Sequence, residues 1–546
     1  MGTYGEALYD IKGGFLIIGL TGYTGSGCSN ASRILRKKSK PTLPDIKTLG
    51  IQPEKRLYSK LEQVWRDLTW GELERFVDIE VSRVIFMFAV YRALCYDCNT
   101  SHLAILRKLV LSGEKEGYLK SVGCLTKDNI DIKQEGVAET LVDAYEKARP
   151  LYRESKKKCY KDTATFIEAM QNFGDDIRKF GCVQPISRRK PEPKNITVLP
   201  EALRRLIKAY IIRKNASRFI IDAFRNPYEV EYFKRSYSEF YLVVIQRPKD
   251  ECRAVLKDPK SQMSSKAIEK LEERERGYKE KRRKNNIGNW VTSQNLDECF
   301  QKADYIIENT SQYSRSRSQL TYNLIRFMCL VKKPGCIPPN KDERNMQIAM
   351  SIKYNSGCLS RHVGAVVVDS KGYVLGIGWN NPPDGQVACA LRTGNELVDS
   401  PCPDQVAFSS SERADVFIKH IGNRYTDKPY CFKDEYGCIS KKGKRAELCR
   451  ALHAEANAIR QVNQKNSKGM TLYTTDSPCE NCAKIIYQSN ISRIVYIEEY
   501  PGIARQQMQS GNKEIKWEQF KGVTGSGYYR LFNSFMPEKD MLDLYS

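Results

Sequence analysis

The chain has 546 residues, enough for two to four domains, and its 41% hydrophobic and 10% aromatic content excludes global disorder. Lysine and arginine outnumber aspartate and glutamate by 89 to 65, which gives a formal net charge of +24. This charge favours polyanionic partners, which include nucleic acids, nucleoside triphosphates and anionic lipids, and it does not choose among them.

Targeting signals and membrane spans are not expected from this sequence. The apolar runs at residues 15–20 and 84–90 are far shorter than the roughly 20 residues that cross a bilayer. The first residues lack a basic segment followed by an apolar segment and a cleavage site. We therefore expect a cytoplasmic protein without membrane contact, whose 18 cysteines are thiols or metal ligands rather than disulfides.

The first half of the chain predicts an α/β unit. An apolar run at residues 15–20 leads into a Gly-rich turn and a helix, and sheet-like runs follow at 217–224, 239–248 and 303–311. Between about residues 45 and 200 the apolar spacing is mainly three and four, which indicates a helical insertion. Strands separated by helices favour a parallel sheet.

A domain junction is expected near residues 332–340, where three prolines and a glycine interrupt two helical patterns. We place the two domains at residues 1–320 and 321–546. Before the junction, residues 264–286 form a charged segment that ends in a basic cluster, and a solvated surface helix is its simplest interpretation.

The second half predicts a smaller α/β/α domain. Strands at 363–369 and 373–380 are joined by a short turn and precede a polar stretch at 385–446. A helix then begins near residue 448, and strand, helix and strand follow at 470–475, 479–488 and 493–498.

The most specific signal is a pair of short motifs in this half. LHAEANAI (452–459) places a His-x-Glu at one predicted helix start, and TTDSPCENCAKII (474–486) places a Pro-Cys-x-x-Cys at another. A catalytic zinc ion takes three protein ligands and keeps one position open, and an imidazole with two thiolates satisfies this requirement. We expect His453, Cys479 and Cys482 to be those ligands, with the helix N-terminus stabilising thiolate charge.

Glu455 then has a separate role as the catalytic residue. A carboxylate two residues beyond the imidazole can remove a proton from an attacking water and return it to a ring nitrogen and a leaving amine. His-x-Glu followed by Pro-Cys-x-x-Cys is the signature of zinc nucleobase deaminases. The alternative, a core histidine with two buried thiols, is disfavoured because the chain has only four histidines and both motifs open helices.

Residues 343–500 resemble the deoxycytidylate deaminases of the cytidine deaminase fold, through CLSRHVGAVVVDSKGYVLGIGWNNPPDG, LHAEANAI and LYTTDSPCENCAKIIYQSNISRIVYIEEY. The resemblance implies a central sheet flanked by helices, with zinc between two helix starts. It also implies that Asn380 binds the substrate sugar or base, and that Ser360 and Arg361 approach its phosphate. For Ser360 and Arg361 the alternative is that they only flank the first strand.

Other cysteines and histidines form weaker patterns. The polar stretch and its flank carry Cys389, Cys402, His420, Cys431, Cys438 and Cys449. A second zinc site is conceivable there, but the irregular spacing favours free thiols on a loop. Cys95, Cys98 and His102 form C-x2-C-x3-H within a helical region rich in apolar residues, where core packing is the better interpretation.

The segment GYTGSGCS fits the phosphate-binding template G-x4-G-K-[ST], except that Cys28 replaces the lysine. Gly22, Gly25 and Gly27 still allow backbone N–H groups to converge on an anion beside a helix start, and Ser29 could reach Mg²⁺. Without the lysine, efficient phosphoryl transfer is doubtful. The alternative is a Gly-rich turn that binds no ligand.

Residues 217–233 resemble a core strand of nucleotide-kinase-like P-loop proteins, in which an acidic residue follows an apolar run. Asp222 holds that position here, and the alternative is a strand-end carboxylate that caps a turn. Residues 303–311 resemble the last strand of those proteins. Residues 1–320 therefore resemble a regulatory P-loop kinase-like domain with a degenerate phosphate loop.

The combination of both halves resembles the bacterial anti-phage deoxycytidine nucleotide deaminases. The resemblance implies zinc-dependent deamination of dCTP or dCMP to deoxyuridine nucleotides, which depletes the dCTP pool during infection. It also implies a nucleotide effector at the N-terminal domain, an inhibitory small RNA and a homo-oligomer.

Three alternatives stay open. A polynucleotide deaminase acting on tRNA or single-stranded DNA is favoured by the net charge, but the deaminase stretches match enzymes of free nucleotides. An active kinase with a vestigial deaminase is disfavoured by Cys28. A non-catalytic regulator that binds nucleotide or RNA is disfavoured by the intact zinc motifs.

Overall fold

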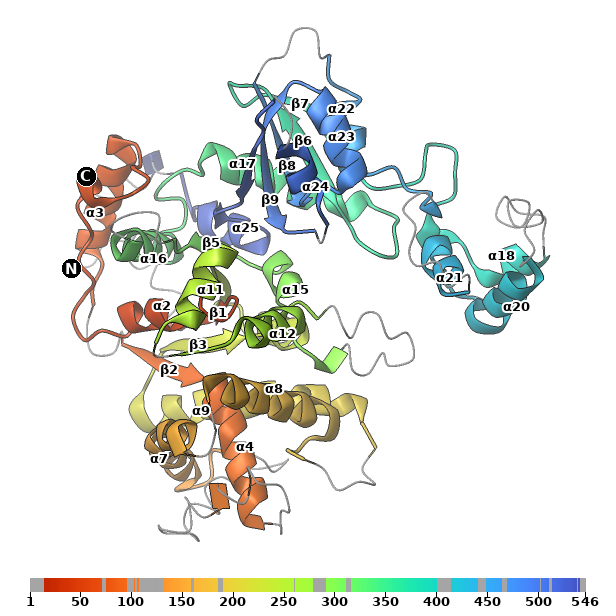
Figure 1. The fold of residues 1–546 in the computed structure, drawn as a ribbon. Coiled ribbons are helices and arrows are strands. Elements are labelled where there is room, and N and C mark those ends of the chain that lie inside the picture. The colour runs from red at the N-terminus through yellow and green to blue at the C-terminus, as the bar shows by residue number, and fades with distance from the viewer. Residues whose placement is uncertain are drawn as a thin grey trace. The chain divides into compact units, whose positions relative to one another are not determined.

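The chain folds into two units in the computed structural model, and each is described by itself (Figure 1). One comprises Met1–Pro338 with Ser526–Ser546, and the other Pro339–Gly525. The break after Pro338 falls within the junction predicted near residues 332–340. The domain limit placed at residue 320 instead falls inside helix α16 (Ser316–Lys332), which packs on α2, α3 and β5. The structure describes residues 14–70, 75–95, 131–158, 162–184, 190–259, 261–277, 291–310, 316–399, 414–439, 448–463, 469–500, 502–509, 513–537 and 539–540, with single positions between 103 and 125.

The N-terminal unit is built on a parallel sheet in which the strands follow the order β5-β4-β1-β3-β2. The strands are β1 (Leu16–Thr21), β2 (Phe76–Glu80), β3 (Arg218–Phe224), β4 (Phe240–Gln246) and β5 (Tyr305–Glu308). The helices are α2 (Cys28–Leu35), α3 (Lys55–Asp67), α4 (Val81–Cys95), α7 (Val137–Lys158), α8 (Thr163–Phe180), α9 (Val198–Lys214), α10 (Pro227–Ser236), α11 (Lys249–Lys257), α12 (Ser265–Glu275), α15 (Leu296–Gln301), α16 and α25 (Ser526–Phe532). The predicted α/β class agrees with this mixed architecture.

Burial explains why the central strands are so apolar. Every residue of β1 (LIIGLT) and β4 (FYLVVIQ) is buried, as expected where both faces of a parallel sheet are covered. The predicted helical insertion is helical over most of its described length, but Phe76–Glu80 within it form the edge strand β2 beside β3. This strand has only five residues and two of them are acidic, so its pattern gave no sheet signal.

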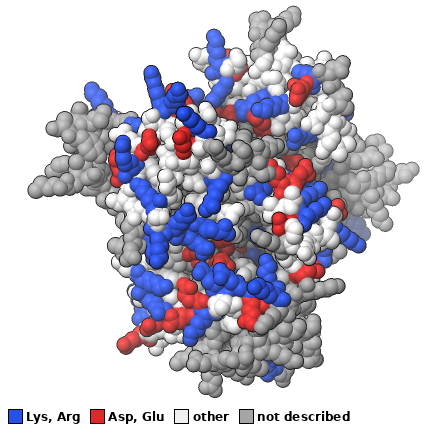
Figure 2. All heavy atoms as spheres, turned by 60° about the vertical axis from the view of Figure 1, so that its left-hand side comes forward, with Lys and Arg blue, Asp and Glu red and all other residues white. Residues whose placement is uncertain are grey.

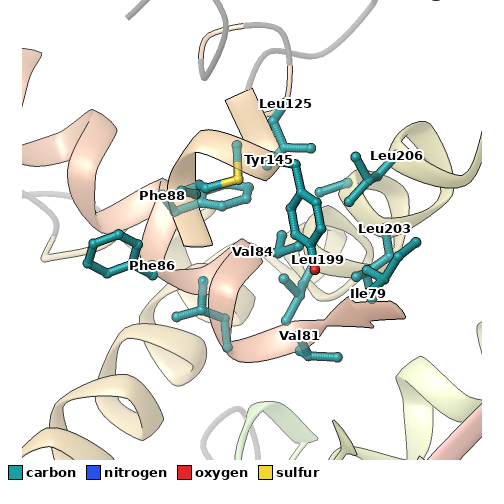
Figure 3. Close-up of a cluster of buried hydrophobic side chains, with 14 of the residues drawn as sticks. Ile79, Val81, Val84, Phe86, Phe88, Leu125, Tyr145, Leu199, Leu203 and Leu206 are labelled. Carbon is teal, nitrogen blue, oxygen red and sulfur yellow. The ribbon is translucent and has the colours of Figure 1, made fainter. Parts of the chain in front are cut away.

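A helical layer formed by α4, α7, α8 and α9 shares one apolar core with this sheet. Figure 3 shows Val84 of α4, Tyr145 of α7 and Leu203 of α9 in one cluster. The Tyr145 hydroxyl accepts a hydrogen bond from the Glu80 backbone N–H at 2.7 Å, which joins this layer to the end of β2. The core therefore extends from the sheet into the insertion.

The C-terminal unit contains a sheet in the order β10-β9-β8-β6-β7. Strand β6 pairs antiparallel with β7 and β8, and β8, β9 and β10 are parallel. The strands of this sheet are β6 (Gly364–Val368), β7 (Val374–Trp379), β8 (Met470–Asp476), β9 (Ile491–Glu498) and β10 (Lys516–Gln519). The short strand β11 (Gly522–Val523) is not part of it. The helices are α17 (Lys341–Ile352), α18 (Gly394–Asp399), α20 (Ala414–Tyr425), α21 (Phe432–Ile439), α22 (Ala454–Ile459), α23 (Glu480–Gln488) and α24 (Ala504–Gln509).

Helix α17 packs on one face of this sheet, and α22 and α23 lie on the other (Figure 1). The start of α17 is fixed by a capping box between Asn340 and Glu343. Glycines in β7 let α22 approach closely, because a Cβ at Gly378 would lie 2.2 Å from the Ala454 carbonyl oxygen. The sheet and α22 therefore meet backbone to backbone at the helix that carries the His-x-Glu motif.

The predicted polar stretch at 385–446 contains helices α18, α20 and α21. Phe417, Ile421 and Tyr430 form a small core between them. The described part of the stretch is therefore largely helical, where its polar composition suggested a loop.

Among the helices that the structure describes, none combines the length and apolar character that a bilayer crossing needs. On the face shown in Figure 2, lysine and arginine side chains are interspersed with acidic ones. The basic cluster predicted at the end of residues 264–286 lies largely outside the described residues.

Candidate metal centre and its surroundings

Three side chains from two helix starts converge in the C-terminal unit. His453 is the N-cap residue of α22, Cys479 is the N-cap residue of α23, and Cys482 lies in the first turn of α23. The His453 Nδ1 atom lies 3.3 Å from each of the two Sγ atoms, and the three atoms all lie within 4.8 Å of one another. One nitrogen and two sulfurs at this separation fit a tetrahedral zinc ion with one position left open.

The local chain explains why these ligands meet. Strand β8 ends at Asp476, and Ser477 and Pro478 lead directly to Cys479 at the start of α23. Helix α22 packs on α23 and on β7, which places His453 opposite the two cysteines. Two hydrogen bonds lower the pKa of Cys479 to about 3. The larger effect comes from the Cys482 thiol and the smaller one from His453. A thiolate, the form that binds zinc, is therefore favoured at this position.

Glu455 lies beside the cluster and is only 4% exposed. The Cys482 thiol donates a hydrogen bond to its Oε2 atom at 3.5 Å. Burial raises the pKa of Glu455 to about 7 and outweighs the lowering by its backbone hydrogen bond and by His453. A carboxyl group with this pKa can both accept and donate a proton near neutral pH.

The Asn380 amide is engaged in backbone contacts. Its Nδ2 donates to the Arg361 carbonyl at 2.8 Å, and its Oδ1 accepts from the Val363 N–H at 2.7 Å. The side chain is therefore part of the support of the segment that leads into β6. Contact between Asn380 and a substrate stays a prediction.

Arg361 is held by two carboxylates. Its Nη1 donates to Asp476 at the end of β8 and to Glu498 at the end of β9, the latter at 2.9 Å. The guanidinium also lies over the Tyr500 ring, 5.4 Å from its centroid. The backbone N–H of the exposed Ser360 donates to the Cys358 Sγ at 3.4 Å. Sequence reasoning missed both carboxylates, because they lie more than a hundred positions away along the chain.

The weaker cysteine patterns form no second cluster in the part of the chain that the structure describes. Among those residues, His453, Cys479 and Cys482 are the one group of three or more metal-ligand side chains within such a distance. The His420 Nε2 atom lies 2.9 Å from the Oε2 atom of Glu435, so the partner of this ring nitrogen is a carboxylate and not a thiol. Cys98, His102 and Cys402 lie outside the described residues, as does the side chain of Cys438.

The Gly-rich loop of the N-terminal unit connects β1 to α2. Gly22, Gly25 and Gly27 all have positive φ angles, which glycine adopts readily. Cys28 is buried, and burial raises the pKa of its thiol to about 12, so it supplies no charge to the loop. The Ser29 hydroxyl donates to the Asp222 carboxylate at 3.0 Å, which brings together two of the residues predicted for the nucleotide site.

A carboxylate from α12 also contacts this loop, and sequence reasoning missed it. The Thr24 backbone N–H donates to both oxygens of Glu275, at 3.2 and 3.3 Å, and the Thr24 hydroxyl also donates to it. Arg225 pairs with the same carboxylate, which is 2% exposed. The Gly-rich loop is therefore held by an acidic side chain of the protein itself.

Comparison with known proteins agrees with the deaminase resemblance. Residues 339–498 match the family model described as the cytidine and deoxycytidylate deaminase zinc-binding region. The deoxycytidylate deaminase of Enterobacteria phage T4 is 32% identical over 167 residues, which cover 28% of this chain and 76% of the phage protein. That of Mycobacterium phage D29 is 30% identical over 161 residues, which cover 30% of this chain and 97% of the phage protein.

A solved structure of a dCMP deaminase from the cyanophage S-TIM5, in complex with dCMP and dUMP, shares 22% identity. The match covers 34% of this chain and 99% of the cyanophage protein, with a TM-score of 0.21. With the family model and the two phage relatives, the resemblance predicted for residues 343–500 is confirmed. The chain belongs, through its C-terminal unit, to the cytidine and deoxycytidylate deaminase family.

Proposed function

We propose that the C-terminal unit catalyses the zinc-dependent hydrolytic deamination of a deoxycytidine nucleotide to the corresponding deoxyuridine nucleotide. The observation that carries the proposal is the convergence of His453, Cys479 and Cys482 beside the buried carboxyl group of Glu455. Zinc in this ligand set would supply the Lewis acidity that makes water a nucleophile near neutral pH.

Glu455 carries the proton transfers in this proposal. Its carboxylate accepts a proton from the water that attacks the ring carbon bearing the exocyclic amine. It gives this proton to the ring nitrogen, then takes the second proton of the added water and gives it to the amine, which leaves as ammonia. A pKa of about 7 suits both directions of transfer, because neither the acid nor the base form is strongly favoured.

The substrate class follows from the phage relatives, which are named deoxycytidylate deaminases. dCMP is therefore the first substrate to test, and dCTP is the second member of the same class. If dCTP is consumed, the reaction depletes the pool on which phage DNA synthesis depends, and the protein would act in antiviral defence. Homo-oligomer assembly and silencing by a small RNA stay predictions from the resemblance.

The test is a substrate panel with a matched pair of variants. Zinc-loaded wild-type protein is incubated separately with dCMP, dCTP, tRNA and single-stranded DNA, and uracil and inosine products are assayed. We expect product only from the free nucleotides. Glu455→Ala should lower turnover by about 10²- to 10⁴-fold with zinc content unchanged, whereas Glu514→Ala, at an exposed position, should keep full activity. Product from tRNA or DNA alone, or an active Glu455→Ala variant with bound zinc, would contradict the proposal.

The N-terminal unit supports a second proposal, a nucleotide site that regulates the enzyme without transferring phosphate. Its basis is the Ser29–Asp222 pair beside a Gly-rich loop that lacks the lysine. Isothermal titration with ATP and dCTP, with and without Mg²⁺, tests it. We expect Mg²⁺-dependent binding that Ser29→Ala weakens, and no γ-phosphate transfer. Absence of binding under both conditions would exclude the regulatory site.

A further inference from the structure

We propose that Arg361 is a positioning residue that fixes the segment carrying the zinc ligand Cys479, and that it does not contact the substrate phosphate. The proposal rests on the deaminase function above, and it reverses the role that the resemblance implies for Arg361.

The guanidinium joins two strand ends next to the metal centre. Its Nη1 atom bridges Asp476, the last residue of β8, and Glu498, the last residue of β9. Cys479 follows Asp476 by three positions, so the bridge acts on the short segment from which the ligand projects. Both carboxylates are less than a tenth exposed, which makes them poorly screened partners.

Further contacts hold the same segment from both sides. The Ser477 backbone N–H donates to the Glu498 carbonyl at 2.8 Å, and the Ser477 hydroxyl accepts from the Tyr500 N–H at 2.8 Å. The Asn380 Nδ2 donates a hydrogen bond to the backbone carbonyl of Arg361. Arg361 is therefore the side chain that connects the Asn380 segment to the strand ends before the ligand.

The charge at this position argues against a phosphate contact. The Arg361 guanidinium already faces two carboxylates, which place negative charge at the same position. A nucleotide phosphate, itself an anion, would meet this charge in a setting that screens it weakly. A bridge of this composition stabilises protein structure and is a poor anion receptor.

The C-terminal unit contains a matched control. Arg493 also pairs with two carboxylates, Asp342 and Glu518, and its side chain is 29% exposed, the same as that of Arg361. Its partners lie on α17 and β10 rather than beside the zinc ligands. Arg493→Lys therefore disturbs a second two-carboxylate bridge, whose partners are 25% and 26% exposed, at a position away from the candidate metal ligands.

The experiment compares Arg361→Lys, Arg361→Gln and Arg493→Lys in the full chain. Zinc release to a chromogenic chelator is measured after circular dichroism has shown that each variant is folded. Residues that orient metal ligands typically change metal affinity by about 10- to 100-fold. We expect Arg361→Gln to release zinc at least about tenfold faster than the wild type, with Arg361→Lys intermediate and Arg493→Lys unchanged. Unchanged release in both Arg361 variants would overturn the proposal.

A second measurement separates positioning from phosphate recognition. dUMP and deoxyuridine differ by one phosphate and are not substrates, so their dissociation constants are compared at saturating zinc. We expect the ratio of the two constants to be the same in Arg361→Gln as in the wild type. Loss of a phosphate contact would weaken dUMP alone by about 10- to 100-fold, and that result would also overturn the proposal. If no cytosine nucleotide is deaminated, the proposed function fails while zinc release still decides the role of Arg361.

Discussion

Asp222, near the end of β3, provides a quantitative test of the free-energy cost of ionising a buried carboxyl group in the N-terminal unit. Burial, together with the nearby Asp78, raises the pKa of its carboxyl group to about 6 from an ordinary value of 3.8. This difference corresponds to about 3 kcal/mol, an upper limit for the cost of ionising Asp222 in the folded protein. The pKa of Asp222 is higher in the folded than in the unfolded protein. Its contribution to folding stability is therefore fully present below about pH 4, where the carboxyl group is protonated, and is lost as the pH rises through 6.

Asp222→Asn removes the ionisation but keeps an oxygen that the Ser29 hydroxyl can reach. We therefore expect equal stability of variant and wild type near pH 4, and a variant that is more stable by up to about 3 kcal/mol at pH 8. Amide hydrogen exchange of β1 and β3, corrected for intrinsic rates, should show up to about 100-fold greater protection at pH 8. Asp67→Asn, at an exposed position, serves as the control. An advantage that does not change between the two pH values would refute the reasoning.

Three further substitutions each test a contact that lies within one of the two units. Gly378→Ala places a Cβ against the α22 backbone, and we expect faster zinc release to a chelator because the His453 helix must shift. Glu229→Gln removes the carboxylate charge 2.7 Å from the buried Arg178, which keeps Asp175 at 3.2 Å, and should lower the unfolding free energy of the N-terminal unit by about 1–3 kcal/mol, measured by hydrogen exchange. Glu275→Gln weakens the contact with the Gly-rich loop and should cost about 1–3 kcal/mol, seen as lost protection in β1 and α2.

The convergence of the candidate zinc ligands could be predicted because the information for it is local. Each motif spans a few residues at a helix start, so spacing alone places the ligand atoms on one side of a turn. The burial of the central strands was equally accessible, since continuous apolar runs such as Phe240–Gln246 indicate a covered parallel sheet. The segment 385–446 was harder, because its helices bury only a small apolar core and composition alone suggested a loop.

The supports of both sites could not be predicted, because they depend on residues far apart in the chain. Arg361 meets Asp476 and Glu498 at separations of 115 and 137 positions, and Thr24 meets Glu275 at 251. A single sequence contains many arginines and acids, and pattern does not pair them. Arg493 also pairs with two carboxylates, so sequence alone does not distinguish it from Arg361, whose bridge lies beside the candidate metal ligands.

Buried carboxyl groups in the two units fall into two kinds, and the difference bears on function. Glu229 lies 2.7 Å from the Arg178 guanidinium, so its negative charge is compensated by a buried cation. Glu455 and Asp222 have no such ion pair among the described residues, and the side chains that donate hydrogen bonds to them are a thiol and a hydroxyl. Their pKa values are raised to about 7 and about 6, so each is costly to keep ionised. A protein gains no stability from such a group, which is why buried acids without a cation mark the positions where chemistry or ligand binding is expected.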